Sequence, residues 1–394
     1  EDLIGDPRFI DREARAQNAE ELYNIFANAY ASIDGVTYGS LKAAVTAAKA
    51  GETITLLQDV KENVTISKHL TIDGAGKTII GMITTDGKSL KVTIKNVNFD
   101  GNNGTINYAM RADDDLNLVV ENCSVKDYLY GFLYANKSND KIVVKNVTVE
   151  NCAEYGAYLV AFNSASFENF TVKGQTKYGV VVANAGARTV NFKNVSFEDA
   201  ETPLHINELG TGKVTFKFSG INDMSKAEFY TSEYVNVVAA AQVGTKVCGS
   251  LQDAVVAAND GETVKVLADV NMTTENFVTQ VDGYATLVNV AGKAVTIDLN
   301  GKTITATDKS TSSYAMIYNK GNLTINNTTG EGAIVLKAEN NRGWNAYSSV
   351  ISNQRGEFVL NGGTIEHLGG TDMAYGIDNL TNGKGTYAVT TIEG

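Results

Sequence analysis

Proline is almost absent from this sequence. Only Pro7 and Pro203 occur among its 394 residues. A proline inside a β-sheet removes a hydrogen bond between strands, so sheets tolerate it only at edges and bulges. A chain this poor in proline is suited to extensive strand pairing. Its 37 glycines can supply the tight corners that many short strands require.

Long apolar runs and an excess of positive charge are also missing. No run of about 18 apolar residues occurs, so we expect no membrane insertion within this chain. The formal net charge is −12, which argues against nucleic-acid binding because phosphate backbones attract Lys and Arg. The same charge disfavours an anionic polymer as ligand, although a local basic cleft could still hold one. No signal peptide is visible at Glu1.

Cysteine is sparse, with only Cys123, Cys152 and Cys248. An odd and sparse set is not a disulfide framework. No metal-binding spacing such as Cys-x-x-Cys or His-Glu-x-x-His occurs. Cys123 occupies a position that holds Val or Phe in four related segments, which indicates a small core residue. A bridge between Cys123 and Cys152 in neighbouring repeats remains an alternative.

One short phrase recurs in the first half of the chain: an apolar residue, a charged residue, Asn, then an apolar residue or Cys. It contains Asn96, Asn122, Asn146, Asn169 and Asn194, at spacings of 26, 24, 23 and 25 residues. A near-constant period of this length is typical of a solenoid, and alternation within the phrase indicates strands. Stacked coils pair in parallel about 4.8 Å apart, so we expect inward-facing Asn side chains to form a hydrogen-bonded ladder. The predicted fold is an all-β parallel β-helix.

A second duplication predicts two modules. Residues 39–60 match residues 249–270 without a gap, and residues 71–79 match residues 296–304. The offset rises from 210 to 225 between the two matches, so we expect a 15-residue insertion around Thr273–Lys293. Ser40 and Ser250 are good helix N-caps, and Gly51 and Gly261 read as left-handed stops after a short helix. Each copy is therefore a capping helix that opens a β-helix module, one over residues 36–235 and one over 236–394.

The two ends of the chain read differently from the modules. Asp11 could cap a helix that runs to about Ser32 and covers the open end of the solenoid, because an exposed sheet edge invites aggregation. Residues 1–35 are thus expected to be a helical cap, or a linker from an upstream domain. The sequence before Gly394 reads like the middle of a coil, so we expect the natural polypeptide to continue and the second module to be truncated.

Tyrosine recurs between the Asn phrases. Tyr130, Tyr155 and Tyr178 each precede a small or apolar pair, at spacings of 25 and 23 residues, and Tyr314, Tyr347 and Tyr375 follow at 33 and 28. The wider spacing predicts longer loops in the second module. The tyrosines at coil corners, which also include Tyr128 and Tyr158, form either an exposed aromatic stripe or a stacked core ladder.

The start unit resembles the opening of pectate-lyase-like right-handed β-helices. Its order of Gly-Ser-Leu, Ala-Val, Gly-Glu-Thr and Asp-Val is also similar to repeated surface proteins of gut and other anaerobic bacteria. The resemblance implies a right-handed parallel β-helix and an extracellular or cell-surface location. It assigns no reaction, because the superfamily contains lyases, hydrolases, esterases, phage spikes and adhesins.

Catalytic signatures of that superfamily are missing or weak. Polygalacturonase-like hydrolases on this fold need paired carboxylates, with Gly-His-Gly-like and Arg-Ile-Lys-like elements, and none is found. Lyases on this fold use an Arg or Lys base with Ca²⁺. The one candidate is Arg111 beside Asp113, Asp114 and Asp115, whose carboxylates could hold Ca²⁺. The alternative is a solvated loop in which aspartates favour turns.

A sugar-stacking platform is the other candidate site. Trp344 is the only tryptophan and lies in a polar loop with Arg342 and Tyr347. An exposed indole can stack on the apolar face of a saccharide, although packing of the loop against its own coil is the alternative.

These observations favour a non-catalytic, secreted or cell-surface protein that binds a polysaccharide, host glycan or host protein surface in the manner of an adhesin. The predicted cofactor is none, with Ca²⁺ as the exception at the aspartates. Two alternatives remain: a polysaccharide lyase or hydrolase with an atypical, Ca²⁺-dependent site, and a structural spacer between other domains.

Overall fold

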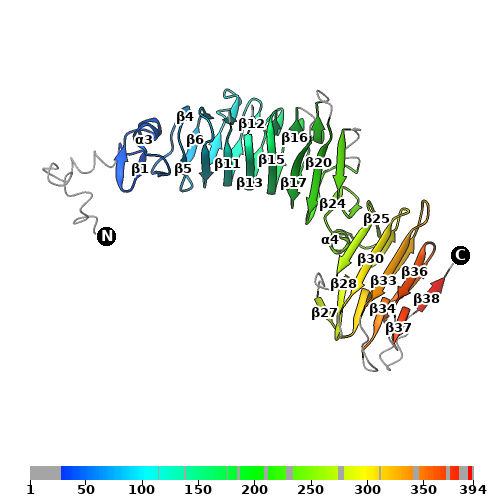
Figure 1. Cartoon of the computed structure of the whole chain (residues 1–394). Helices are drawn as coiled ribbons and strands as arrows, with labels where there is room; N and C mark the ends of the chain where they lie inside the picture. Colours follow the sequence, from blue (N-terminus) through cyan, green and yellow to red (C-terminus); the bar gives the residue numbers. More distant parts are fainter. Residues whose placement is uncertain are drawn as a thin grey trace. The chain divides into compact units, whose positions relative to one another are not determined.

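The computed structural model describes residues 28–113, 115–136, 139–174, 176–183, 187–207, 212–227, 234–273, 279–309, 312–339, 346–369, 373–380 and 389–392 (Figure 1). Its parallel stacked strands form a β-solenoid of about 10 turns, with 58% strand and 4% helix. The chain divides into two compact units. The first contains Glu1–Phe216 and Asp223–Asn236, and the second contains Lys217–Asn222 and Val237–Gly394.

The described part of the first unit begins with an antiparallel hairpin, β1 (Ala31–Ile33) and β2 (Val36–Tyr38), followed by helix α3 (Leu41–Ala47). Its coils then run around three sides, and strands of successive coils pair in parallel. One side contains β3 (Thr53–Leu56), β5 (Leu70–Asp73), β8 (Lys91–Lys95) and β17 (Arg188–Lys193). The next contains β6 (Thr78–Ile80), β9 (Asn98–Asp100) and β18 (Ser196–Phe197). Three long strands bend across both sides: β11 (Asn117–Lys126), β13 (Asn139–Glu150) and β15 (Phe162–Lys173).

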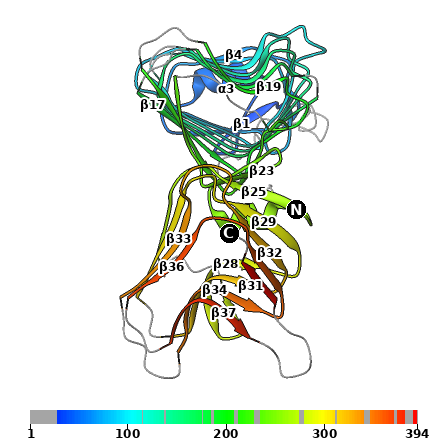
Figure 2. The ribbon, with the colours of Figure 1, turned by 90° about the vertical axis from the view of Figure 1, so that its right-hand side faces the viewer.

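The third side of the first unit is a seven-stranded parallel sheet. In spatial order it contains β4 (Val64–Ile66), β7 (Ile83–Thr85), β10 (Tyr108–Ala112), β12 (Gly131–Ala135), β14 (Tyr155–Leu159), β16 (Tyr178–Val182) and β19 (Thr202–Ile206). Its first and last strands, β4 and β19, lie on the same side of the coil in Figure 2. The chain passes between the units at β20 (Val214–Ser219), β21 (Ile221–Asp223) and β22 (Val235–Val238).

The second unit repeats the same opening. It has the hairpin β23 (Ala241–Val243) and β24 (Lys246–Cys248) and then helix α4 (Leu251–Ala257). Its coils again have three sides, visible in Figure 2. The first side contains β25 (Glu262–Val266), β29 (Ala294–Asp298), β32 (Asn322–Asn326), β35 (Glu357–Leu360) and β38 (Val389–Ile392), and the second contains β26 (Val270–Thr273), β30 (Thr303–Asp308), β33 (Ala333–Ala338) and β36 (Thr364–Leu368). The third side contains β27 (Thr279–Val281), β28 (Tyr284–Val290), β31 (Tyr314–Asn319), β34 (Ser348–Gln354) and β37 (Ala374–Leu380). The segment expected to hold the insertion contains the antiparallel hairpin β27–β28.

Both predicted capping helices are present, and their N-caps are confirmed. The side chains of Ser40 and Ser250 accept hydrogen bonds from the N–H groups of Ala43 and Asp253. Gly51 and Gly261 have φ values of 90° and 83°, so they are left-handed as expected, but each lies three residues beyond the helix C-cap. Neither α3 nor α4 is long and apolar enough to cross a membrane, within the described part of the chain.

The predicted N-terminal helix is wrong at its C-terminal end. Ala31–Ile33 form strand β1, which pairs with β2 and β3. The alternation of Ala31 and Ile33 with Ser32 places the two apolar side chains in the core, as a strand requires. The rest of the predicted helix, from Asp11 to residue 27, lies outside the described residues.

The asparagine ladder exists, but on the outside of the coil. The amide of Asn96 donates to Asp73 at 2.9 Å, and Asn122, Asn146, Asn169 and Asn194 each donate to the preceding Asn at 2.7–3.4 Å. The last four are exposed. All five have φ between 50° and 56°, a left-handed conformation that Asn tolerates better than most residues. The prediction that these side chains face inward is therefore wrong.

Charged side chains on the outer surface alternate in sign from coil to coil. One column runs through Asp73, Lys95, Glu121, Lys145, Glu168 and Lys193 in register. Glu168 lies 2.7 Å from Lys193 and 3.1 Å from Lys145, and these hydrogen bonds lower the pKa of Glu168. Parallel in-register stacking would otherwise place like charges side by side, which is destabilising. The alternation leaves this column without the continuous positive track that a polyanion requires.

Candidate functional site

Aromatic side chains collect on the outer surface of the seven-stranded sheet. Met110, Leu133, Ala157 and Val180 stack in register and point into the core. The residue after each therefore points outward, and this second row contains Arg111, Tyr134, Tyr158, Val181 and His205. A parallel row contains Tyr108, Gly131, Tyr155 and Tyr178. We call Tyr108, Tyr134, Tyr155, Tyr158, Tyr178 and His205 the tyrosine face.

The ring contacts of the tyrosine face fall into two groups, one of four rings from β10, β12 and β14 and one of the two rings from β16 and β19. Ring centroids lie 5.2 Å apart for Tyr108 and Tyr134, 5.6 Å for Tyr134 and Tyr158, and 5.0 Å for Tyr155 and Tyr158. At the far end, Tyr178 and His205 stack at 4.5 Å. All except the buried Tyr155 are partly exposed. The exposed-stripe alternative therefore holds for the partly exposed Tyr158 and Tyr178, whereas Tyr155 and Tyr128 are buried, and the hydroxyl of Tyr128 donates to the carbonyl of Gly81.

A glycine makes room for the central ring. A Cβ on Gly131 would lie 2.3 Å from the carbonyl oxygen of Tyr155 and 2.5 Å from its ring. The Tyr155 ring can therefore lie over β12 only because residue 131 has no side chain. The recurring Tyr-Gly pairs in the sequence carry this signal, although they do not reveal which side of the sheet the ring occupies.

Polar groups frame the tyrosine face at both ends. Arg111 lies 5.9 Å from the centroid of the Tyr134 ring and donates to Asp113 at 2.9 Å. At the other end, Asn207 donates to the hydroxyl of Tyr158 at 2.7 Å and contacts His205 at 2.9 Å. Such groups can orient a polar ligand that stacks on the rings.

The phenols of Tyr134 and Tyr155 are hydrogen-bonding groups rather than acids or bases. Desolvation raises the pKa of Tyr134, and desolvation with the neighbouring Tyr108 hydroxyl raises the pKa of Tyr155 further. Both hydroxyls therefore stay neutral at physiological pH, where each can donate and accept a hydrogen bond. The arrangement can bind a neutral polar ligand, and Arg111 and Asp113 are its only charged pair among the residues just described.

The predicted calcium cluster is only partly visible. Asp113 pairs with Arg111, Asp115 is half-buried with φ of 33°, and Asp114 lies outside the described residues. Among the described residues, no group of three His, Cys, Asp or Glu side chains is placed to hold a metal ion. Calcium binding stays a prediction that depends on Asp114.

The predicted sugar platform of the second module is likewise incomplete. Trp344 and Arg342 lie outside the described residues. Tyr347 is half-buried, and its ring centroid lies 6.2 Å from Tyr284 and 6.3 Å from Tyr375. The structure thus places Tyr347 beside Tyr375, with which it recurs in the sequence, and beside Tyr284, which the recurrence did not include.

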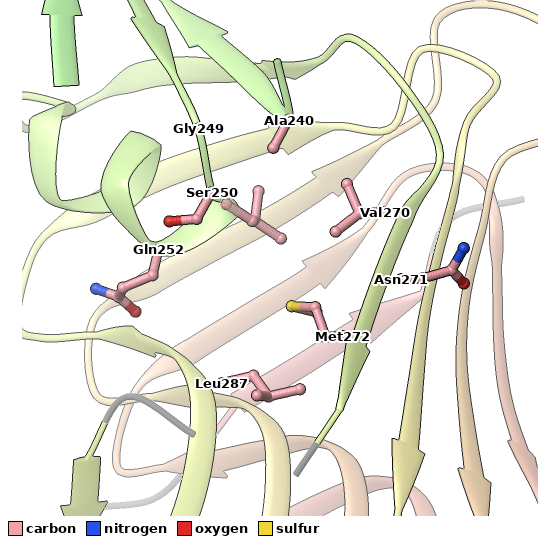
Figure 3. A pocket seen from close by; sticks show the side chains of 9 residues that line it. Ala240, Gly249, Ser250, Gln252, Val270, Asn271, Met272 and Leu287 are labelled. Carbon is pink, nitrogen blue, oxygen red and sulfur yellow. The ribbon is translucent and has the colours of Figure 1, made fainter. Parts of the chain in front are cut away.

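A pocket in the second unit offers little chemistry. It has a volume of about 280 Å³ and lies beside the start of α4 (Figure 3). Val270, Met272 and Leu287 lie toward its centre, whereas Asn271 points away. Its lining contains no charged side chain, so it has no general acid or base.

Elsewhere in this unit, Ser348 contacts His367 at 2.9 Å, but Ser348 is fully buried and cannot meet a substrate as a nucleophile.

The cysteines are free thiols in the interior. Cys123 stacks on Val147 as predicted for a core position, and no Cys123–Cys152 bridge forms. Burial raises the pKa of Cys123 to about 11 and the pKa of Cys152 and Cys248 to about 12. Because the thiolate is the reactive form, these residues are not nucleophiles in the folded protein.

We therefore expect native protein to resist thiol-reactive dyes at mildly alkaline pH and to label all three cysteines after unfolding in urea. Raised pKa values keep the thiolate fraction low until the pH approaches them, and burial blocks access. Labelling kinetics followed by mass spectrometry measures this, and peptide mapping identifies each cysteine. Rapid stoichiometric labelling of Cys123 without denaturant would contradict the buried position.

The comparisons with known proteins assign no activity. No curated protein and no solved structure matches the chain. A model for a family described as a domain of unknown function (DUF4957) matches residues 58–180, which is less than half of the chain. The matched segment lies in the first unit and contains five of the six residues of the tyrosine face, so the chain is similar to this family in the segment that carries most of the candidate site.

Proposed function

We propose that this protein is a non-catalytic, glycan-binding protein of the cell surface or of secretions, with the tyrosine face as its binding surface. The observation that carries the proposal is the contact of aromatic rings across successive coils of one exposed sheet. Aromatic rings supply large apolar area, and their hydroxyls supply polar contacts at the edge. A saccharide presents apolar C–H faces and polar hydroxyls, and so complements such a surface.

The shape of the face favours a polymer over a monosaccharide. Its rings come from β10, β12, β14, β16 and β19, which follow one another at the strand spacing of about 4.8 Å. A chain of sugars lying along the stacking direction would contact several rings at once. The net charge of −12 and the alternating charge column favour a neutral or cationic polysaccharide over a polyanionic one.

The cell-surface location and the adhesin-like role are part of the same proposal. The β-solenoid fold, the repeated start unit and the resemblance to bacterial surface proteins support them. A long repetitive surface suits the binding of extended polymers on host or neighbouring cells, because solenoids present elongated ligand-binding faces.

A polysaccharide lyase is the second candidate, and one observation favours it. Arg111 and Asp113 lie at one end of the tyrosine face, where a base next to a bound sugar would be needed. Against a lyase, the Nε–H of Arg111 donates a hydrogen bond to the carboxylate of Asp113, so each of the two groups already has a partner in the absence of substrate. Incubation with uronate polymers, with and without Ca²⁺, tests this candidate. New unsaturated products that disappear in Arg111→Ala would establish the lyase.

Replacing Tyr134 and Tyr158 together by alanine should lower glycan affinity at least tenfold. Truncating a central aromatic side chain commonly costs more than about 1 kcal/mol of binding free energy, and about 1.4 kcal/mol corresponds to a factor of ten. A glycan array identifies the ligand first, and calorimetry then compares the variant with wild type. The double phenylalanine variant should retain most of the affinity, because it keeps the rings.

Lys145→Ala with Glu168→Ala is the matched control. It changes β13 and β15, which belong to the same coils as Tyr134 and Tyr158, but on a different side. Equal loss of binding in this control would show that fold damage, and not the rings, explains the result. Unchanged binding in the Tyr134→Ala, Tyr158→Ala variant would overturn the proposed site.

A further inference from the structure

The second unit has its own row of tyrosines on the third side of its coil. Ring centroids lie 5.8 Å apart for Tyr284 and Tyr318, 6.2 Å for Tyr284 and Tyr347, and 6.3 Å for Tyr347 and Tyr375. Tyr318 belongs to a small cluster with Tyr284 and Ala315 that is separate from the main core. Tyr375 is 37% exposed, so the row reaches solvent at its last coil.

A buried carboxyl group lies on the same side of this sheet. Ile377 packs against the main core, so the next residue, Asp378, points to the opposite side together with Tyr318 and Ser352, its register partners. Asp378 is only 8% exposed, and its Oδ2 atom has no hydrogen-bond partner. A buried polar atom without a partner carries a desolvation cost, which a ligand can relieve.

No cation compensates Asp378 within the described part of the second unit. The hydroxyl of Ser352 donates a hydrogen bond to Asp378, and Tyr284 interacts with Asp378, Tyr347 and Tyr375. Burial raises the pKa of Asp378, with the Ser352 hydrogen bond acting in the opposite direction. Of the nearby cations, Lys320 forms an ion pair with Asp282, and Arg355 is close to Asp282 and Tyr318.

We propose that this surface binds the protonated amine of an amino sugar, with Asp378 as the anionic partner and Tyr347 and Tyr375 as the stacking platform. Oδ2 is covered in the structure, so the amine reaches it only when the side chains over it move aside. A charge-assisted hydrogen bond to Oδ2 then supplies both the missing donor and the missing positive charge. The tyrosine rings add cation–π attraction for the ammonium group and apolar area for the sugar ring. A neutral sugar would leave the buried carboxylate without a counter-charge, so the site should select deacetylated hexosamines.

This site is separate from the tyrosine face, and its ligand selectivity goes beyond the function proposed above. All of its residues lie in the second unit, whereas the tyrosine face lies in the first.

Calorimetry on the full chain with three probes tests the proposal: a glucosamine hexamer, an N-acetylglucosamine hexamer and hexalysine. We expect the glucosamine hexamer to bind at least tenfold more tightly than the other two, and Asp378→Asn to abolish this preference. Equal affinity for the two sugars would overturn the role of the amine. Equal affinity for hexalysine would show that the surface recognises amines on any polymer, and would overturn the sugar assignment.

Two further variants keep the result interpretable. Asp378→Asn removes a buried charge, so its unfolding midpoint should be equal to or above that of wild type. If it fails to fold, the partly exposed Tyr375→Ala should lower glucosamine affinity in its place, and an unchanged affinity would count against the site. The Tyr134→Ala, Tyr158→Ala variant should keep the amine-dependent preference, so that failure of one site is distinguishable from failure of the other.

Discussion

Replacing Phe170 by alanine should lower the free energy of unfolding of the first unit by about 3–5 kcal/mol. The side chain is fully buried in β15. Its ring lies 5.0 Å from Phe167, 6.3 Å from Phe132 and 6.3 Å from Phe197. A stacked coil cannot collapse around the cavity, because its backbone is hydrogen-bonded to the coils on both sides. The cost should therefore include a cavity term as well as the lost apolar burial.

Urea unfolding followed by circular dichroism measures this loss, and hydrogen exchange locates it. Protection should fall most in β12 and β18, which contribute the neighbouring rings, because each repeat of a solenoid is stabilised mainly by its neighbours. Phe170→Leu is the matched control and should cost less, since it leaves a smaller cavity. A loss below about 1 kcal/mol for the alanine variant would show that the coil relaxes, in conflict with the close packing that interiors of this kind require.

The stacking register was predictable from sequence, because a repeated phrase must repeat its environment. Asn122, Asn146 and Asn169 do lie over one another, and so do the residues beside them. The sequence also contains a signal for their outward orientation, because the alternation of apolar and polar residues breaks at each Asn. Leu118, Val120, Cys123 and Val125 are all buried, at spacings of two, three and two residues. A left-handed residue at position 122 resets the alternation, so that Asn122 points outward while both its flanking strands keep their apolar side chains inside.

The candidate surfaces were less predictable. Recurrent tyrosines in the sequence are equally compatible with a core ladder, and only the contact of the Tyr155 ring with the partly exposed Tyr158 shows that it belongs to the outer face. The second unit has an inward ladder of Asn319 and Asn353, whose side chains are 2.8 Å apart and fully buried. The sequence does not reveal this ladder, because its residues do not recur at a fixed spacing. Long loops vary the coil length there, so equivalent positions do not recur at a fixed period. Asp378 could not be singled out for the same reason.

Replacing Asn146 by alanine should cost about 2–3 kcal/mol of stability, more than replacement by glycine. Asn146 has φ of 51°, and the left-handed region costs an ordinary L-residue about 1–2 kcal/mol. Alanine also removes the bonds to Asn122 at 2.9 Å and from Asn169 at 2.7 Å, each with a net value of about 0.5–1.5 kcal/mol and less where water competes. Glycine loses the same bonds but adopts the left-handed conformation without the steric cost.

The comparison of the two variants separates conformation from hydrogen bonding, since they lose the same side-chain contacts. Equilibrium unfolding in urea gives both values, and Asn146→Asp serves as the control that keeps an acceptor in the ladder. If glycine costs as much as alanine, the ladder and not the backbone conformation explains why Asn recurs in every phrase. If glycine costs clearly less, as we expect, Asn recurs mainly because it tolerates the left-handed conformation at the bend of each coil. The exposed hydrogen-bonded ladder, which forms because the five bends are aligned, then makes the smaller contribution to stability.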